Sequence, residues 1–337
     1  MMKIKNSKAG IVFITILLFF LCGCFSGKMK RYEDEKFLFG TYIKIIVYST
    51  SKKEAKKNIE IGFQEIERVE NKFNSKVSGS IIESLNTSKK REILLDPEGL
   101  YMFKKIDDIY KLTKYKYDIT INPLLEVWGF FSSKESENIP TTLEIEAAKE
   151  LVGFEKVSVK NGLLKLNGNV KELDTGSFLK GYALEMAKKK MIEAGVTKAF
   201  LTSVSSITTI GVKPSDVPWK VGIQNPNISK EILGYVTLDG ESMGISGDYQ
   251  TLVEINGKKY HHIIDKNTGY PILDKKMVVI VGDDGFMVDL LSTGLFLMGK
   301  EEVESYIKDN KKFKILVVWK NMSISKSKNF ELNSLKN

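Results

Sequence analysis

The 337-residue sequence is poor in cysteine, histidine and proline. Its two cysteines, Cys22 and Cys24, both lie near the N-terminus. The rest of the chain therefore offers no disulfide bond, no thiolate nucleophile and no cysteine-ligated zinc site. The two histidines are adjacent, and no Ser-His-Asp or Cys-His arrangement is evident. Seven prolines and 26 glycines leave no room for a long low-complexity region.

The overall composition is that of an ordinary globular protein, with 42% hydrophobic and 28% charged residues. These values exclude a fully disordered chain, a collagen-like chain and a membrane protein with many spans. The formal charge of +9 comes from lysines that are spread along the chain. Because no basic stripe is interleaved with aromatic residues, we interpret the charge as a solvated surface and expect no nucleic-acid partner.

The N-terminus has the pattern of a secretory signal. Three lysines precede an uncharged stretch whose centre, Ile11–Leu21, is almost wholly apolar. The run ends in Leu-Cys-Gly-Cys, which resembles the lipobox of bacterial lipoproteins. This resemblance implies a signal peptide at 1–23, a mature chain beginning at lipidated Cys24, and a location on the extracytoplasmic face of the cell membrane. An uncleaved anchor helix and a cleaved soluble product are the alternatives.

The body of the chain mixes helical and extended patterns. We expect residues 24–36 to be a short charged tether and residues 37–330 to be one compact unit that could have two lobes. Apolar residues at helical spacing predict helices, whereas Asn-Gly pairs predict tight antiparallel hairpins. The predicted helices are Lys53–Phe73, Pro97–Lys114, Ser177–Ala194, Met287–Met298 and Glu301–Asp309. The predicted hairpins are Val157–Leu166 and Thr251–Ile264, and the predicted strands are Phe37–Tyr48, Lys198–Ser203, Trp219–Ile223, Ile232–Leu238, Met277–Gly282 and Phe313–Trp319. This mixture favours an α+β fold with antiparallel sheets and packed helices.

Two clusters carry side chains that could take part in catalysis or metal binding. His261 and His262 end the second hairpin, and adjacent residues of a strand point to opposite faces, so at most one can face a given site. An exposed surface pair is the simpler interpretation. Asp289 and Thr293 are one helical turn apart and could supply two oxygens to Mg²⁺, with substrate phosphates and water completing the shell. A helix-start aspartate with a threonine bonded to the backbone is the alternative.

Two further segments are ambiguous by themselves. Asp174–Ala183 has the pattern of a strand end, a glycine turn and a helix start, where free backbone N–H groups suit a phosphate. It lacks the Walker A pattern, and an ordinary turn explains it equally well. Tyr117–Phe130 contains Asn-Pro and Trp-Gly-Phe and could belong to the core or line a pocket for an aromatic ring.

Taken in order, these segments resemble the ApbE family, the FAD:protein FMN transferases. Asp174–Ala183 is similar to the family's Asp-x-Gly-(Gly/Ala)-Ile-Ala-Lys-Gly-Tyr-Ala, and Asp289–Thr293 resembles its Asp-Ala-Leu-Ser-Thr. Phe39–Thr41, Tyr117–Phe130 and Ser246–Pro271 resemble its other motifs. Among the departures from the pattern, Ser205-Ser206 replaces a frequent Gly-Gly.

The resemblance implies a role for each matching position. Asp289 and Thr293 would bind Mg²⁺ through side chains, and Ser177 would add a backbone carbonyl. Residues along the cleft for FAD would be Thr120, Pro123 and Trp128. Residues that bind the pyrophosphate and flavin end would be Asp174, Lys180, Tyr249, His262, Asp265 and Thr268. His262 or Asp265 would be the catalytic base, and His261 would remain a surface residue.

The implied reaction is Mg²⁺-dependent transfer of FMN from FAD to a Thr or Ser hydroxyl of an exported redox flavoprotein, with release of AMP. The implied acceptors are Rnf- or Nqr-type subunits with a site that resembles Ser/Thr-Gly-Ala-Thr. Hydrolysis of FAD to FMN and AMP is one alternative, and a flavin-binding lipoprotein without enzymatic activity is the other.

Overall fold

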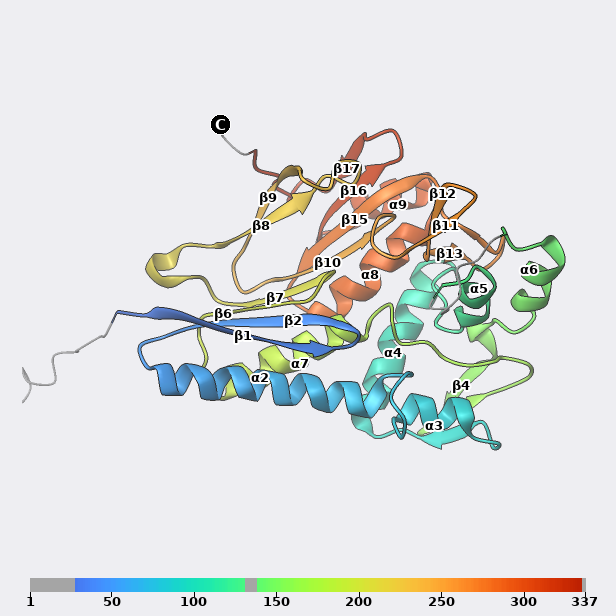
Figure 1. Cartoon of the computed structure of the whole chain (residues 1–337), viewed down its shortest axis with the longest axis horizontal. Coiled ribbons are helices and arrows are strands. Elements are labelled where there is room, and N and C mark those ends of the chain that lie inside the picture. The colour runs from blue at the N-terminus through green and yellow to red at the C-terminus, as the bar shows by residue number, and fades with distance from the viewer. Residues whose placement is uncertain (1–27, 131–137, 335–337) are drawn as a thin grey trace, which may run out of the picture.

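The computed structural model describes residues 28–130 and 138–334 (Figure 1). The predicted signal peptide and Cys24 lie outside the described residues. The predicted α+β class is confirmed, since an eight-stranded antiparallel sheet packs against helices (Figure 1). In spatial order its strands are β1 (Lys30–Leu38), β2 (Thr41–Ser49), β6 (Ala199–Thr202), β7 (Ser206–Ile210), β10 (Ser242–Gly247), β15 (Lys275–Gly282), β16 (Lys314–Trp319) and β17 (Ile324–Lys326).

The first hairpin corrects two predictions. Residues 30–36, expected in a tether, belong to the edge strand β1, and the single strand expected at Phe37–Tyr48 is the end of β1, a turn and most of β2. Phe39 and Gly40 form that turn with φ of 53° and 71°. Charged side chains have low strand propensity, but they suit an edge strand because they discourage pairing with other chains. Pairing with β2, rather than the local pattern, therefore defines β1.

Helices cover one face of the sheet. Alternate residues of β2, Ile43, Ile45 and Val47, are buried in the main core together with apolar residues of the helices. These helices are α2 (Lys52–Phe73), α4 (Pro97–Leu112), α7 (Leu179–Glu193), α8 (Gly285–Leu297) and α9 (Lys300–Asp309). Ser51 and Asp96 cap the first two by accepting backbone hydrogen bonds. The five predicted helices are confirmed to within a few residues at each end.

The opposite face of the sheet is covered in part by a hairpin of β8 (Trp219–Gln224) and β9 (Ile232–Leu238). Its inward side chains, among them Trp219 and Leu238, form a second core with Met277, Val279 and other residues of the sheet. This layer covers only part of the sheet (Figure 1).

A smaller lobe has its own apolar core around Leu124, Trp128 and Tyr260. Its elements are α5 (Asn122–Val127), α6 (Thr142–Lys149), β11 (Leu252–Ile255), β12 (Lys258–His261), β13 (Ile264–Asp265) and β14 (Tyr270–Pro271). Beside it lie α3 (Ile81–Thr87), β3 (Glu92–Leu94), β4 (Val157–Lys160), β5 (Leu163–Leu166) and the short turn η1 (Phe154–Lys156); η2 (Pro214–Asp216) precedes β8. Both predicted Asn-Gly hairpins are confirmed as β4–β5 and β11–β12. Among the described residues, no helix combines the length and apolarity needed to cross a bilayer.

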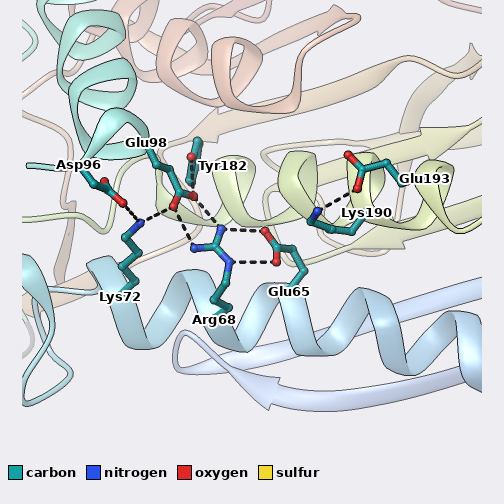
Figure 2. A network of polar contacts seen from close by, with 8 residues as sticks. All are labelled: Glu65, Arg68, Lys72, Asp96, Glu98, Tyr182, Lys190 and Glu193. Atoms are coloured by element: carbon teal, nitrogen blue, oxygen red, sulfur yellow. Dashed lines mark hydrogen bonds and ion pairs between the residues drawn. The ribbon is translucent and has the colours of Figure 1, made fainter.

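A network of charged side chains joins α2, α4 and α7 (Figure 2). Arg68 on α2 forms paired hydrogen bonds with Glu65 (2.7 and 2.9 Å) and with Glu98 at the start of α4 (2.7 and 2.9 Å). Glu98 also accepts from Lys72 at 2.6 Å and from the Tyr182 hydroxyl of α7 at 2.8 Å. Burial raises the pKa of Glu98, but these donors outweigh it and bring the pKa to about 2. The network therefore ties the first turn of α7 to its neighbours.

Candidate active site

A cavity of about 620 Å³ lies where the turn between β1 and β2, the start of α7, the end of β10 and the helix α8 meet. Its lining includes Asp174, Ser177, Lys180, His262, Asp289 and Thr293, which are six of the predicted site residues. The first and the last of these residues lie more than 100 positions apart in the sequence. A second cavity of about 580 Å³ shares Lys116 and Leu297 with the first and holds Asp265 and Thr268.

The loop before α7 forms one wall of the main cavity. The Asp174 carboxylate accepts the Gly176 N–H at 2.9 Å, and burial raises the pKa of Asp174. The Tyr117 hydroxyl contacts the Ser177 hydroxyl at 2.8 Å, and Lys180 donates to the Gly176 carbonyl at 3.1 Å. Phe178, the N-cap residue of α7, makes no side-chain capping hydrogen bond. Backbone N–H groups and a lysine at a helix start suit a phosphate group.

Asp289 is a buried carboxylate of the site, with 4% of its surface exposed. Its Oδ2 accepts the Gly181 N–H of α7 at 2.9 Å, and its Oδ1 accepts the Ser206 hydroxyl of β7 at 3.0 Å. Burial raises the pKa of Asp289 to about 6, while the charge of Lys180 and the two hydrogen bonds oppose that rise. The carboxylate is therefore fixed from two sides.

Thr293 follows one turn later on α8, as the helical spacing predicts. Its hydroxyl contacts the Ser246 hydroxyl of β10 at 3.0 Å. Ser246 contacts Ser292 at 2.9 Å, and Ser292 donates to the backbone carbonyl of Asp289 at 2.9 Å. A chain of hydroxyl groups thus links β10 to the turn of α8 that carries Asp289.

The residues around this corner of the cavity fit a hard divalent cation. Ser177, Asp289 and Thr293 line the same cavity and offer only oxygen atoms, which are the ligands that Mg²⁺ prefers. Within the described part of the chain, no three His, Cys, Asp or Glu side chains cluster in a way that could hold a metal. A cation here would therefore need further oxygens from phosphate or water.

The two histidines separate as the strand pattern predicts. His262 lines the cavity, and its buried Nδ1 has no hydrogen-bond partner among the described residues. Burial, and then the neighbouring His261, lower the pKa of His262 to about 4. His261 points the other way, where its ring packs against Phe296 and contacts the Ile272 carbonyl. The prediction that His261 lies at the surface is wrong, since only 4% of it is exposed.

Three residues expected along the cleft lie in the core instead. Thr120, Pro123 and Trp128 are buried and do not line either cavity. Trp128 donates to the Gly269 carbonyl at 2.8 Å and packs against Tyr260, so the core interpretation of this segment is confirmed. The face of α5 that reaches the main cavity carries Leu125 instead.

Three other predicted residues lie beside the main cavity rather than in its lining. Tyr249 packs against the second core and directs its hydroxyl to the sulfur of Met277 at 3.4 Å. Asp265 and Thr268 lie in the second cavity, where the Asp265 carboxylate accepts the Asn267 N–H at 2.9 Å. The structure thus brings six of the predicted site residues together in one cavity and leaves these three outside its lining.

Three residues of the site are not among the predicted site residues. Ser206 and Gly181 contact Asp289 directly, and Asp118 lines the cavity while it binds Lys266 at 2.7 Å. In the sequence, Ser206 stands out only as a departure from Gly-Gly. A serine at a position where glycine is frequent is the only hint in the sequence that Ser206 belongs to the site. Its partner Asp289 lies 83 residues away, so the contact itself is not predictable.

The model of the ApbE family matches residues 39–317 of this sequence. The chain belongs to the ApbE family. The FAD:protein FMN transferase of Vibrio cholerae is 28% identical over 206 residues, which is 60% of this chain and 62% of that protein. The Haemophilus influenzae protein of the same name is 26% identical over 279 residues, covering 78% and 80% of the two chains.

Solved structures agree with this assignment. The ApbE protein from Thermotoga maritima has a TM-score of 0.81 and 28% identity, covering 89% of this chain and 98% of that one. The Vibrio cholerae flavin transferase has a TM-score of 0.79 at 21% identity and supports the fold. In sequence, the chain spans a little over half the length of the first relatives it matches, between 56% and 62%.

Proposed function

We propose that this chain is a FAD:protein FMN transferase of the cell surface. The observation that carries the proposal is the shared cavity, which is lined by Lys180 at the start of α7 and by Asp289 and Thr293 of α8. A phosphate site and a hard-cation site side by side suit a substrate with a pyrophosphate, and FAD is such a substrate. The names of the relatives support the same activity.

In the proposed reaction, the hydroxyl of a Thr or Ser on an acceptor protein attacks the phosphorus on the FMN side of FAD. A new phosphoester bond forms, the P–O bond to the AMP half breaks, and AMP leaves. The neutral imidazole of His262 lines the cavity and accepts the proton of the hydroxyl. The Lys180 side chain and the backbone N–H groups of Ser177 and Lys180 bind phosphate oxygens and orient the pyrophosphate.

Mg²⁺ bound by Asp289, Thr293 and the Ser177 carbonyl would neutralise the charge that grows on the departing phosphate. The hydrogen bonds from Gly181 and Ser206 keep the Asp289 carboxylate in one orientation. Asp265 lies in the second cavity, which leaves His262 as the preferred base.

The proposal extends to location and partners. The N-terminal pattern supports a lipid anchor at Cys24, which would hold the domain outside the cytoplasm. The acceptors would then be exported redox flavoproteins of the Rnf or Nqr type. β1 begins at Lys30, so few residues separate the anchor from the folded body.

The test uses a soluble form that starts at Ser26. It is mixed with FAD, Mg²⁺ and a peptide that contains Ser-Gly-Ala-Thr, and the peptide mass and the AMP released are measured. A peptide that gains FMN, with AMP release that EDTA abolishes, supports the transferase. AMP and free FMN with an unmodified peptide would indicate a FAD hydrolase, and bound FAD with neither product would indicate a flavin carrier.

Two aspartate variants make the test specific. Asp289→Ala should abolish Mg²⁺-dependent turnover. Asp283→Ala is the matched control, since this exposed aspartate lies just before the same helix and outside the cavity. An equal loss of turnover in both variants would contradict the assignment of Asp289 as a metal ligand.

A further inference from the structure

An exposed apolar strip crosses the sheet at the mouth of the main cavity. Phe37 of β1 and Tyr42 of β2 are directly opposite in the ladder, and their rings meet edge to face at 5.3 Å. They are 63% and 65% exposed. Large aromatic side chains at this exposure, paired with each other rather than with a core, are typical of surfaces that bind proteins.

Two further apolar side chains lie on the cavity side of the sheet. The β2–β6 ladder ends with Lys44 opposite Thr202, and Val204 follows in the turn between β6 and β7. Val204 is 68% exposed and lines the cavity. Ile245 of β10 is partly buried and also lines the cavity. We call the set Phe37, Tyr42, Val204 and Ile245 the mouth strip.

The mouth strip lies on a sheet face that is covered elsewhere. Side chains two residues apart on a strand share a face, so Tyr42 shares the face of Ile46 and Tyr48. Ile46 and Tyr48 pack beneath the β8–β9 hairpin in the second core. The β8–β9 hairpin does not extend over Tyr42, although exposed apolar side chains continue toward the cavity.

The strip also joins the cavity through the hairpin turn. Phe39, Gly40 and Thr41 line the cavity and lie between Phe37 and Tyr42 in the chain. The aromatic pair therefore adjoins the part of the cavity wall that this turn forms.

The charges beside the strip indicate the kind of partner. Lys44 and Glu35 are opposite each other in the ladder and form an ion pair at 3.2 Å. The two side chains next to the aromatic pair therefore carry no net charge between them. Neutral, aromatic and exposed side chains suit an uncharged apolar segment of a protein.

We infer that the mouth strip is the docking surface for the acceptor protein, and that it binds apolar side chains that flank the acceptor hydroxyl. This inference rests on the proposed transfer to a protein. It adds a specificity determinant outside the catalytic cavity, since Phe37 and Tyr42 do not line the cavity itself.

The experiment uses two fluorescent peptides of about 15 residues, which span roughly 50 Å when extended. Both contain Ser-Gly-Ala-Thr, and they differ only in having Leu and Phe or Ser at the flanking positions. Anisotropy without FAD should show about tenfold tighter binding of the apolar peptide to the wild-type protein. The double variant Phe37→Thr and Tyr42→Thr should lose this preference while its affinity for FAD is unchanged.

The control variant is Leu143→Ser, which removes an 81% exposed leucine on α6 and should retain the preference. A photoreactive benzoylphenylalanine at position 42 should cross-link the apolar peptide, whereas the same group at position 143 should not. This second measurement holds even if the double variant folds poorly, because it keeps an aromatic ring at position 42.

Three results would overturn the inference. They are equal binding of both peptides by the wild-type protein, an unchanged preference in the double variant, and a concentration-dependent dimer that the double substitution abolishes. The last would assign the strip to self-association. Failure of the proposed function is distinguishable, because it would appear as the absence of FMN on either peptide even where binding follows the predicted preference.

Discussion

The hydroxyl of Ser206 donates a hydrogen bond of 3.0 Å to Oδ1 of Asp289, across the interface between β7 and α8. Both side chains are buried. Where the family often has glycine, this chain has a side chain that binds the central carboxylate of the site. The hydrogen bond favours the ionised form of Asp289 and limits its rotation.

Removing this hydroxyl should weaken metal binding. Ser206→Ala leaves Oδ1 of Asp289 without that donor, which raises the pKa of Asp289 above its value of about 6. We expect Mn²⁺ affinity, followed by electron paramagnetic resonance, to fall about tenfold, because a hydrogen bond to a charged group is worth about 1.5–3 kcal/mol. The acidic limb of the activity profile should move to higher pH. Ser305→Ala removes an exposed serine–aspartate contact and should change neither quantity.

Replacing the carboxylate should stabilise the metal-free protein at alkaline pH. The pKa of Asp289 is about 6 in the folded protein, against an ordinary value of 3.8. Its contribution to stability is therefore fully present below pH 4 and is lost as pH rises through 6. Asp289→Asn should gain up to about 3 kcal/mol over the wild type at pH 8 and nothing at pH 4. Urea unfolding in EDTA measures this difference, and a variant that is less stable at pH 8 would contradict the assignment of burial as the cause.

A side chain at position 181 should separate α7 from α8. A Cβ there would lie 2.4 Å from Cβ of Asp289 and 2.6 Å from the Gly285 carbonyl. Gly181→Ala should destabilise the fold by about 1–3 kcal/mol and abolish Mg²⁺-dependent activity. Gly222→Ala is the control, because its Cβ would meet Ile232 at an ordinary 3.5 Å. Thermal unfolding and AMP release separate the two variants, and equal behaviour would refute the close-packing argument.

The charged network should matter more than an isolated ion pair. Arg68→Ala leaves Glu65 and Glu98 without their shared partner, and we expect a loss of about 1–3 kcal/mol. The exposed Lys190–Glu193 pair in Figure 2 is the control, and Lys190→Ala should cost less than about 0.5 kcal/mol. Because the pKa of Glu98 is depressed to about 2, the network's contribution is present above pH 4.5 and is lost as pH falls toward 2. The difference between the two variants should shrink over that range in urea unfolding.

His262 should not titrate near neutral pH in the folded protein. Burial lowers the pKa of both histidines, and the pKa of His262 falls to about 4, so His262 remains neutral from pH 6 to 8. Its contribution to stability is then present above pH 6.5 and is lost as pH falls toward 4. Nitrogen-15 NMR can follow both rings directly, because the chain has only two histidines. A midpoint near 6.5 for His262 would contradict its burial and weaken its assignment as a base that is neutral at pH 7.

Local sequence determined much of the architecture. Helices such as α2 and α8 were predictable because apolar residues recur at the helical period, and Asn256-Gly257 specified a hairpin because both residues adopt positive φ. The same period placed Asp289 and Thr293 on one face of α8. The separation of His261 from His262 followed from strand alternation.

Tertiary structure alone decided the rest. The strand β1 exists through its pairing with β2. β2 in turn pairs with β6 across some 150 residues of intervening chain, and no local periodicity in the sequence predicts this pairing. The same applies to the contact between Ser206 and Asp289. Trp128 was ambiguous because a core and a pocket both favour aromatic side chains, and only the packing around Tyr260 distinguished them. Local conformation depends on neighbours a few residues away, whereas the walls of a cavity depend on which distant segments the sheet and helices bring together.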